Sequence, residues 1–270
     1  MNNIAVIMSV YRGDTSVYLG EALKSLYVQQ PEADIFIQKD GPVSPDVSEY
    51  LAQEHREGRI VYVGERNENR GLAFSLNQLL EIVLKREYQY IARMDADDIA
   101  LSSRMRWQYV YMQEHPDVDV VGGFIEEFSN DIAYEKIVRY PLNHDEMYRF
   151  FAKRVPLAHV TAFFRRSFFE KAGFYPTESP TNEDTLLWMK GFQSGCRFAN
   201  IPEILVKVRV GPAFFSRRGG GRKAWSDLQD RILVIKTLGY NISSYFYAWA
   251  LFMVSIAPSK LKLFLYKRLR

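Results

Sequence analysis

The 270-residue sequence contains a single cysteine, Cys196, so the chain cannot form an internal disulfide. One isolated thiol suggests a reducing compartment and a buried structural role, and it gives no indication of a metal site. The sequence also lacks the run of about 18 apolar residues that a membrane-spanning helix needs. Its N-terminus has no basic region before the first short apolar run, so we expect no signal peptide.

What the sequence does contain is typical of a globular protein. Hydrophobic residues make up 47% and charged residues 25%, which is enough for one large α/β domain or one domain with an appendage. The net charge of +3 hides an uneven distribution. Residues 211–270 hold 11 Lys or Arg and two Asp, a local charge of +9, which leaves −6 for residues 1–210. The basic segment therefore calls for an anionic partner.

The most informative stretch is an acidic sequence that directly follows an apolar run at residues 88–94. Its three carboxylates are Asp95, Asp97 and Asp98. Anions this close repel one another unless a cation lies between them. At the carboxyl end of a strand in an α/β sheet, that cation is commonly a divalent metal that also binds phosphate. The alternative is an exposed acidic turn that caps the next helix, for which one carboxylate would be enough.

Strands and helices alternate through residue 98. Apolar runs predict strands at residues 4–10, 33–38, 59–63 and 88–94. Apolar spacing and end signals predict helices at residues 18–29, 44–58 and 72–84. Apolar strands that alternate with helices predict a parallel sheet with helices on both faces.

The alternation ends after residue 98. We expect further helices at residues 103–115, 143–151, 167–172 and 182–194. We expect further strands at residues 118–128, 133–140, 160–165 and 203–210, the first two of which form a hairpin. Two C-terminal helices are predicted at residues 225–238 and 243–257.

The C-terminal segment, residues 216–270, combines basic and apolar side chains. It begins with a basic loop that contains Arg217 and Arg218, and Lys or Arg is interspersed with apolar residues from 260 to 270. This amphipathic pattern suits a segment that lies in the headgroup layer of an anionic membrane. We therefore expect a cytoplasmic protein that associates peripherally with the inner face of the cell membrane. The alternatives are a helical hairpin packed on the domain and a dimer interface.

Acidic residues follow two different strands of the predicted parallel sheet. Asp40 follows the second strand and Asp95 the last strand of the alternating part. Because the carboxyl ends of parallel strands lie at the same edge of a sheet, both carboxylates are expected to face one cleft. Asp40 suits hydrogen bonds from a nucleobase or ribose, Tyr11 could stack on the base, and Arg70 could reach a phosphate. Their ordinary alternatives are a turn, a packed ring and a solvated side chain.

A second acidic pair, Glu183 and Asp184, begins the predicted helix at residues 182–194. The helix dipole alone favours acidic side chains in a first turn, so the pair by itself is weak evidence. A carboxylate in this position beside an active site can also act as a general base for an incoming hydroxyl. His159 could face the same cleft, although a hydrogen-bonded structural histidine is the expected role.

Five motifs occur in order between residues 4 and 210. They are Ile7–Tyr11, Lys39–Gly41, Asn67–Gly71 with Asn77, Met94–Asp98 and Asn182–Asp184. Together they resemble the inverting family 2 glycosyltransferases. The resemblance implies an α/β, A-type glycosyltransferase fold, in which a Rossmann-like, mostly parallel nucleotide-binding sheet has helices on both faces, here with a helical C-terminal tail. Residues 1–215 would form the glycosyltransferase domain, with a nucleotide-sugar half at 1–100 and an acceptor half at 101–215.

The resemblance implies roles for Ser9, Tyr11, Asp40, Asp95, Asp97 and Asp184, and the residues themselves suggest roles for the other candidates. Asp184 is the expected catalytic base, and Asp97 and Asp98 are the expected ligands of Mg or Mn. Asp95 is expected at the ribose and diphosphate. The full set expected to bind the donor nucleotide or a phosphate is Ser9, Tyr11, Asp40, Arg70, Asp95, Arg217 and Arg218.

One part of the family pattern is missing, namely the Gln-x-x-Arg-Trp motif of processive members. In its place, residues 210–220 are similar to bacterial enzymes that add single sugars to lipid-linked precursors of surface polysaccharides, such as O-antigen or capsule. We therefore expect metal-dependent, inverting, non-processive transfer of one sugar from a nucleotide-diphospho-sugar, expected to be a UDP-sugar. The expected acceptor is a polyprenyl-diphosphate-linked glycan, and no nucleic-acid partner is expected.

Two other functions remain open. A sugar nucleotidyltransferase has a similar sheet and acidic metal site, but it would need a Gly-rich basic loop after the first strand, for which Tyr11–Asp14 is a poor substitute. A non-catalytic nucleotide-binding scaffold at the membrane is the other alternative.

Overall fold

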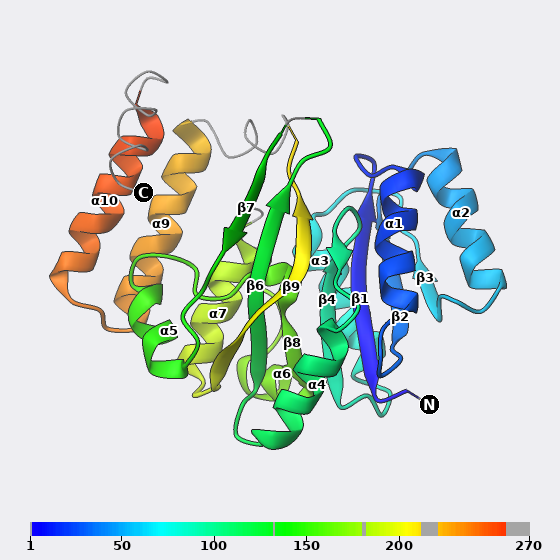
Figure 1. Cartoon of the computed structure of the whole chain (residues 1–270). Coiled ribbons are helices and arrows are strands. Elements are labelled where there is room, and N and C mark those ends of the chain that lie inside the picture. The colour runs from blue at the N-terminus through cyan, green and yellow to red at the C-terminus, as the bar shows by residue number, and fades with distance from the viewer. Residues whose placement is uncertain (1, 132, 180–181, 212–220, 258–270) are drawn as a thin grey trace.

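The computed structural model describes residues 2–131, 133–179, 182–211 and 221–257 of the chain. Within these residues, the centre of the molecule is a nine-stranded sheet with helices on both faces (Figure 1). The strand order is β3-β2-β1-β4-β8-β6-β9-β5, and β7 pairs with β6 outside this path.

The N-terminal half of the sheet is parallel, as predicted. Its strands are β1 (Ile4–Tyr11), β2 (Asp34–Asp40), β3 (Tyr62–Gly64) and β4 (Tyr90–Asp95). The helices between them are α1 (Ser16–Tyr27), α2 (Pro45–Arg56) and α3 (Leu72–Val83). On β1, Tyr11 lies opposite Asp40 of β2, and Ser9 lies opposite Asp95 of β4. This register brings the ends of three strands to one edge of the sheet.

The second half makes the sheet mixed. Its strands are β5 (Ile99–Ala100), β6 (Val120–Phe128), β7 (Glu135–Val138), β8 (Phe163–Arg165) and β9 (Phe198–Arg209). Its helices are α4 (Arg104–Glu114), α5 (His144–Phe151), the 3-10 turn η1 (His159–Thr161), α6 (Arg166–Ala172) and α7 (Glu183–Gln193). The β4–β8, β8–β6, β6–β7 and β9–β5 pairs are antiparallel, whereas β6 and β9 run parallel.

Several strands differ from the sequence prediction. Strand β3 begins at Tyr62 rather than at residue 59, and β8 begins at Phe163 rather than at residue 160 because His159–Thr161 forms the 3-10 turn η1. Strand β9 begins at Phe198 rather than at residue 203, because the exposed Pro202 lies where the β6–β9 register shifts and does not end the strand. Strand β5 has only two residues and was not predicted. It pairs antiparallel with β9, with Ile99 opposite Lys207. This pairing ties the acidic stretch after β4 to the far side of the sheet.

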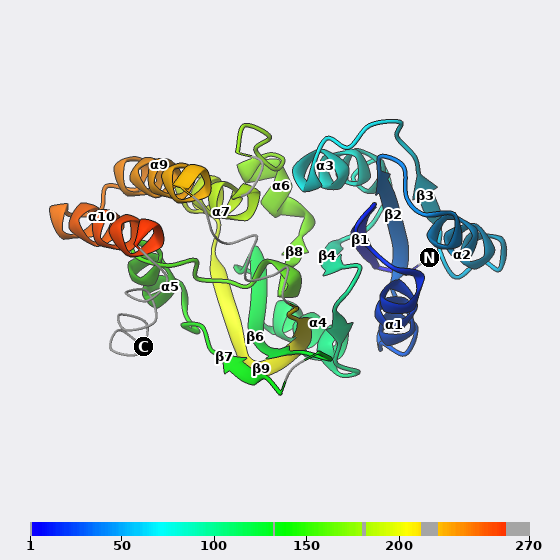
Figure 2. The same ribbon diagram turned by 90° about the horizontal axis from the view of Figure 1, so that it is seen from above.

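Each face of the sheet has its own hydrophobic core. Alternate residues of β1 point to opposite faces, so Val6 and Met8 join one core while Ala5 and Ile7 join the other. The first core also takes buried residues from α1, α2 and α4, and the second takes them from α3, α5, α6 and α7. Figure 2 shows α1 and α4 on one side of the sheet and α3, α6 and α7 on the other. Cys196 is buried in the second core, in agreement with the predicted structural role.

Helices α9 (Gly221–Thr237) and α10 (Ile242–Ile256) follow as a hairpin beside α5 and α7 (Figures 1 and 2). Val234 of α9 is buried in the second core, and the Arg231 guanidinium donates to the Phe151 carbonyl oxygen at 2.7 Å. Of the alternatives for the C-terminal segment, the structure shows a helical hairpin packed on the domain for residues 221–257. None of the described helices combines the length and the apolar character needed to cross a membrane.

The aromatic part of the second core allows a test of its packing. A Cβ atom on Gly191 of α7 would lie 2.7 Å from the Phe198 ring and 2.9 Å from the Phe168 ring. We expect Gly191→Val to lower the free energy of unfolding by about 1–3 kcal/mol, because the rings have no room to move apart without strain. Urea unfolding measures this change.

Ala52→Val on the exposed face of α2 is the matched control, because it adds the same β-branched side chain to a helix without a steric clash. Equal midpoints for the two variants would contradict the predicted close packing around Gly191.

Candidate active site

A cavity of about 520 Å³ lies at the edge of the sheet where β1, β2 and β4 end. The loop before α3, the first turn of α7 and the end of β9 complete its walls. Its lining residues are Ser9, Tyr11, Asp14, Asp40, Asn69, Gly71, Leu72, Asp95, Ala96, Asp97, Asp98, Glu183, Val208 and Arg209. Six of the residues predicted from sequence therefore surround one space. They are Ser9, Tyr11, Asp40, Asp95, Asp97 and Asp98.

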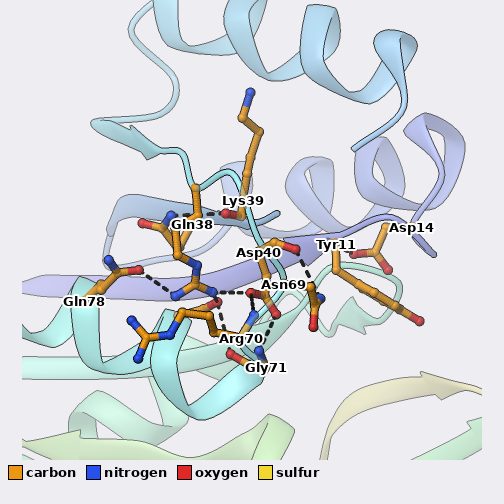
Figure 3. Close-up of polar contacts among 11 residues, drawn as sticks. Tyr11, Asp14, Gln38, Lys39, Asp40, Asn69, Arg70, Gly71 and Gln78 are labelled. Atoms are coloured by element: carbon orange, nitrogen blue, oxygen red, sulfur yellow. Dashed lines mark hydrogen bonds and ion pairs between the residues drawn. The ribbon is translucent and has the colours of Figure 1, made fainter. Parts of the chain in front are cut away.

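Asp40 is held by the loop that follows β3 (Figure 3). Its carboxylate accepts hydrogen bonds from the backbone N–H groups of Arg70 at 2.8 Å and Gly71 at 2.9 Å. The Arg66 guanidinium forms an ion pair with the same carboxylate. Gly71 has a φ of 95°, a backbone conformation that few other residues adopt, and this turn aims both N–H groups at Asp40. The carboxylate is therefore oriented before any ligand binds.

Arg66 was missed in the sequence analysis. Its guanidinium also donates to Gln78 at 2.8 Å and to Ser75 at 2.7 Å, both on α3, so it joins the end of β2 to that helix. The only sequence signal was its place directly before the Asn67–Gly71 motif. Arg70 was expected to reach a phosphate of the donor. Its guanidinium lies 4.0 Å from the centre of the Phe74 ring, and Arg70 is not among the residues that line the cavity.

The three carboxylates of the acidic loop after β4 differ in how far they are buried. Asp95 and Asp97 are partly exposed, whereas Asp98 is 3% exposed and accepts the backbone N–H of Arg209 at 2.8 Å. Burial raises the pKa of Asp98 well above its usual value, and the charges of Asp95 and Asp97 raise it further. Asp98 therefore fastens the loop to β9 at the wall of the cavity, whereas Asp95 and Asp97 present partly exposed carboxylates to it.

A buried arginine compensates part of this negative charge. Arg93 of β4 is 4% exposed, and its guanidinium forms an ion pair with the Asp95 carboxylate. The positive charge of Arg93 also lowers the pKa of both acids at the start of α7, against a larger rise caused by their burial. Arg93 therefore lies close to the carboxylates of two separate segments.

The two acids of α7 have different surroundings. Glu183 lines the cavity, whereas Asp184 does not and accepts the backbone N–H of Thr185 at 2.6 Å. Burial, followed by the charge of Asp184, raises the pKa of Glu183 to about 7. Burial also raises the pKa of Asp184. The two carboxylates are close to each other, and burial favours the protonated form of both.

The remaining expectations concern His159, Arg217 and Arg218. His159 accepts or donates a hydrogen bond at 2.9 Å through Nε2 to the Tyr175 hydroxyl, and burial lowers its pKa well below the usual value, with the charge of Arg93 adding to the effect. It is a partly buried histidine that is hydrogen-bonded to a neighbouring side chain, in keeping with a structural role. Arg217 and Arg218 lie outside the described residues.

A divalent cation fits this arrangement only if a ligand supplies some of its oxygens. Among the residues that the structure describes, no three carboxylate, imidazole or thiol side chains come close enough to hold a metal ion by themselves. Mg²⁺ is commonly bound by one or two carboxylates together with substrate phosphates and water. Asp97 with Asp95 at the cavity wall provides such a partial set.

Comparison with known proteins gives the family. Residues 5–173 match the family described as glycosyl transferase family 2. The amylovoran biosynthesis glycosyltransferase AmsE of Erwinia amylovora is 32% identical over 267 residues, which cover 98% of each chain. An Escherichia coli protein named UDP-Gal:alpha-D-GlcNAc-diphosphoundecaprenol beta-1,3-galactosyltransferase is 28% identical over 229 residues, which cover 83% of this chain and 80% of the relative.

A solved structure agrees with the fold. The mannosyltransferase PcManGT from Pyrobaculum calidifontis, in complex with GDP-Man and Mn2+, aligns over 98% of this chain and 79% of its own with a TM-score of 0.64. At 16% sequence identity the likeness shows the fold alone. The A-type fold expected from the motifs is therefore confirmed. On the match over residues 5–173, the chain belongs to glycosyl transferase family 2.

Proposed function

We propose that the protein transfers one sugar, with inversion, from a nucleotide-diphospho-sugar to a hydroxyl of a polyprenyl-diphosphate-linked glycan during surface polysaccharide assembly. The observation that carries the proposal is the shared cavity, in which Asp40, Asp95 and Asp97 come from two strand ends and Glu183 comes from α7. Its volume of about 520 Å³ lies in the range of small-molecule sites. The E. coli relative, whose name specifies a UDP-sugar and a diphosphoundecaprenol acceptor, supports a UDP donor and a lipid-linked acceptor.

The donor base and ribose would bind at the ends of β1 and β2. Tyr11 is 36% exposed at the cavity wall and offers a ring for stacking. The Asp40 carboxylate has about four lone-pair positions, of which Arg66 and two backbone N–H groups already use three. Asp40 can therefore take one further hydrogen bond from the nucleotide. Arg66 is the positioning residue for that contact.

The diphosphate would bind above the acidic loop. Asp97 with Asp95 would hold Mg or Mn there, whereas the buried Asp98 supports the loop through Arg209. A bound divalent cation neutralises the charge that develops on the departing diphosphate. The Mn2+ of the mannosyltransferase PcManGT, which has the same fold, is in keeping with this choice of cation.

The proton transfer would take place at the start of α7. Asp184 is the proposed base, because its carboxylate is oriented by the backbone N–H of Thr185 and the charges of Arg93 and Lys223 favour its ionised form. It removes the proton of the acceptor hydroxyl, whose oxygen attacks the anomeric carbon from the face opposite the diphosphate. The new C–O bond forms as the bond to the diphosphate breaks, so an α-linked donor gives a β-linked product. Glu183, which lines the cavity, is the competing candidate.

The protein would associate with the inner face of the cell membrane through its C-terminal segment. Helix α10 supports this proposal with a stripe of apolar side chains that are 45% to 73% exposed and recur every three or four residues. The stripe consists of Ile242, Phe246, Trp249, Met253 and Ile256. The basic residues that were expected to contact lipid headgroups lie beyond residue 257, outside the described part of the chain.

We expect Asp97→Asn to weaken UDP binding in the presence of Mg²⁺ by about 10- to 100-fold, because one charged contact to the cation–diphosphate unit is lost. Calorimetric titration with UDP, with and without Mg²⁺, measures the effect. Asp117→Asn, at an exposed acid far from the cavity, is the matched control. If both variants bind UDP as the unaltered protein does, Asp97 is not a ligand of the cation.

We expect Asp184→Asn to lower the transfer rate by at least about 100-fold with UDP binding within a few-fold of the original, because a general base contributes about this much. Glu183→Gln should retain a larger share of the rate. The measurement is UDP release that depends on a polyprenyl-diphosphate-linked sugar. The reverse order of the two variants would assign the base to Glu183, and acceptor-dependent release by the unaltered protein would exclude a non-catalytic scaffold.

We expect the double variant Phe246→Ser and Met253→Ser to lower binding to vesicles that contain anionic phosphatidylglycerol by at least about tenfold, because two apolar side chains no longer enter the bilayer. Sedimentation with vesicles measures the bound fraction. Val17→Ser with Val110→Ser, at exposed apolar positions of α1 and α4, is the matched control. Equal binding by the two double variants would contradict the role of the stripe.

A further inference from the structure

A second cavity, of about 350 Å³, lies among α7, α9 and α10. Its walls come from the first turn of α7, from α9, from α10 and from residues 153–155 after α5. Figures 1 and 2 show α9 and α10 side by side, with α5 and α7 next to them. We call it the acceptor-side cavity, because it lies across α7 from the cavity that contains Asp40 and Asp97.

The first turn of α7 forms a wall of both cavities. Glu183 lines the first cavity, whereas Asn182 and Thr185 line the acceptor-side cavity. Asp184 lies between them in sequence, and its carboxylate accepts both the backbone N–H of Thr185 at 2.6 Å and the Thr185 hydroxyl at 3.3 Å. A molecule bound in the acceptor-side cavity would therefore lie next to the proposed base.

The acidic side chains of the acceptor-side cavity already have partners. Asp230 accepts hydrogen bonds from Ser179 and Asn182, each at 2.7 Å. Asp227 forms an ion pair with Lys223 and accepts a hydrogen bond from Asn182 at 2.8 Å. Both carboxylates are therefore hydrogen-bonded from within α9 and the residues before α7, and the charge of Asp227 is also paired with Lys223.

The three basic side chains of the cavity contact neutral groups, although the charges of Asp184 and Asp227 also act on Arg231. Lys153 lies 5.7 Å from the centre of the Tyr247 ring, Arg154 donates to the Tyr247 hydroxyl at 3.3 Å, and Arg231 donates to the Phe151 carbonyl at 2.7 Å. In the part of the chain that the structure describes, none of the three forms an ion pair with a carboxylate. Lys153 and Arg154 are exposed and Arg231 is partly buried. Three cations around one cavity favour the binding of an anion, and phosphate is a strong acceptor for them.

The opposite side of the acceptor-side cavity is apolar. Leu228 of α9 and Ala248, Leu251 and Phe252 of α10 line it. Leu251 is 40% exposed although it lies against this wall. A ligand that suits the whole cavity must therefore carry both an anionic end and an apolar chain. Inorganic phosphate or a nucleotide would leave the apolar wall uncovered.

We propose that the acceptor-side cavity binds the lipid diphosphate of the acceptor. Lys153, Arg154 and Arg231 bind the two phosphates, and the apolar wall contacts the first isoprenoid units. This assignment rests on the proposed function, because the diphosphate of such an acceptor is attached to the sugar whose hydroxyl must reach Asp184. Helix α10 provides both the apolar wall and the exposed apolar stripe, so a lipid chain that leaves the cavity can pass directly into the bilayer.

Farnesyl diphosphate is a soluble probe for this site. We expect the full chain to bind it in calorimetric titrations, and the double variant Lys153→Gln with Arg154→Gln to bind it at least about tenfold more weakly, because two charged contacts are lost. Lys24→Gln with Arg56→Gln is the matched control, because it removes the same charge from exposed positions of α1 and α2. The control should bind the probe as the unaltered protein does.

Two further titrations separate the phosphate contacts from the lipid contacts. Pyrophosphate and farnesol should each bind more weakly than farnesyl diphosphate, and Leu251→Asn should weaken binding of farnesyl diphosphate while binding of pyrophosphate stays the same. Unchanged affinity of the Lys153 and Arg154 double variant, or displacement of the probe by UDP, would overturn the assignment. Probe binding through these residues in a protein that does not bind UDP would support the assignment and contradict the proposed function.

Discussion

The position of Arg93 is the constraint on which the acidic centre of this molecule depends. Its guanidinium is buried beneath the acidic loop, pairs with Asp95, and lies close enough to Glu183 and Asp184 to lower the pKa of both. Without this charge, carboxylates from β4 and α7 would repel one another across the cavity, with little water to screen them. One buried cation therefore lets two acidic segments approach the same space.

The backbone around Arg93 is held by a second buried arginine. Arg104 of α4 is fully buried and donates to the Arg93 carbonyl at 2.7 Å and to Gln108 at 3.1 Å. Burial and the nearby charge of Arg93 lower the pKa of Arg104 to about 9. Gln108 in turn donates to the carbonyl oxygens of Val121 and Thr161. This network links α4, β4, β6 and η1 across the first core, so the strand that carries Asp95 cannot shift independently of the mixed half of the sheet.

The two cavities suggest how an enzyme with a lipid-linked acceptor can divide its tasks. In the proposed reaction, the parallel half of the sheet would supply the donor side, because its strand ends meet at one edge. The helices α7, α9 and α10 would supply the acceptor side, where basic and apolar groups line one cavity. The first turn of α7 belongs to both, so the proposed base lies at the boundary. Membership of glycosyl transferase family 2 also argues against the alternative of a sugar nucleotidyltransferase.

The sequence by itself determined the family, the parallel half of the sheet and the residues at its strand ends, because continuous apolar strands and ordered motifs are local features. It did not determine that Arg66 holds Asp40, that Arg70 contributes its backbone, or that Asp98 turns inward towards Arg209. Those contacts join segments far apart in the chain. Which acid of the Glu183–Asp184 pair faces the cavity was likewise decided only by the rotation of α7 in the packed core, since neighbouring residues of a helix point about 100° apart.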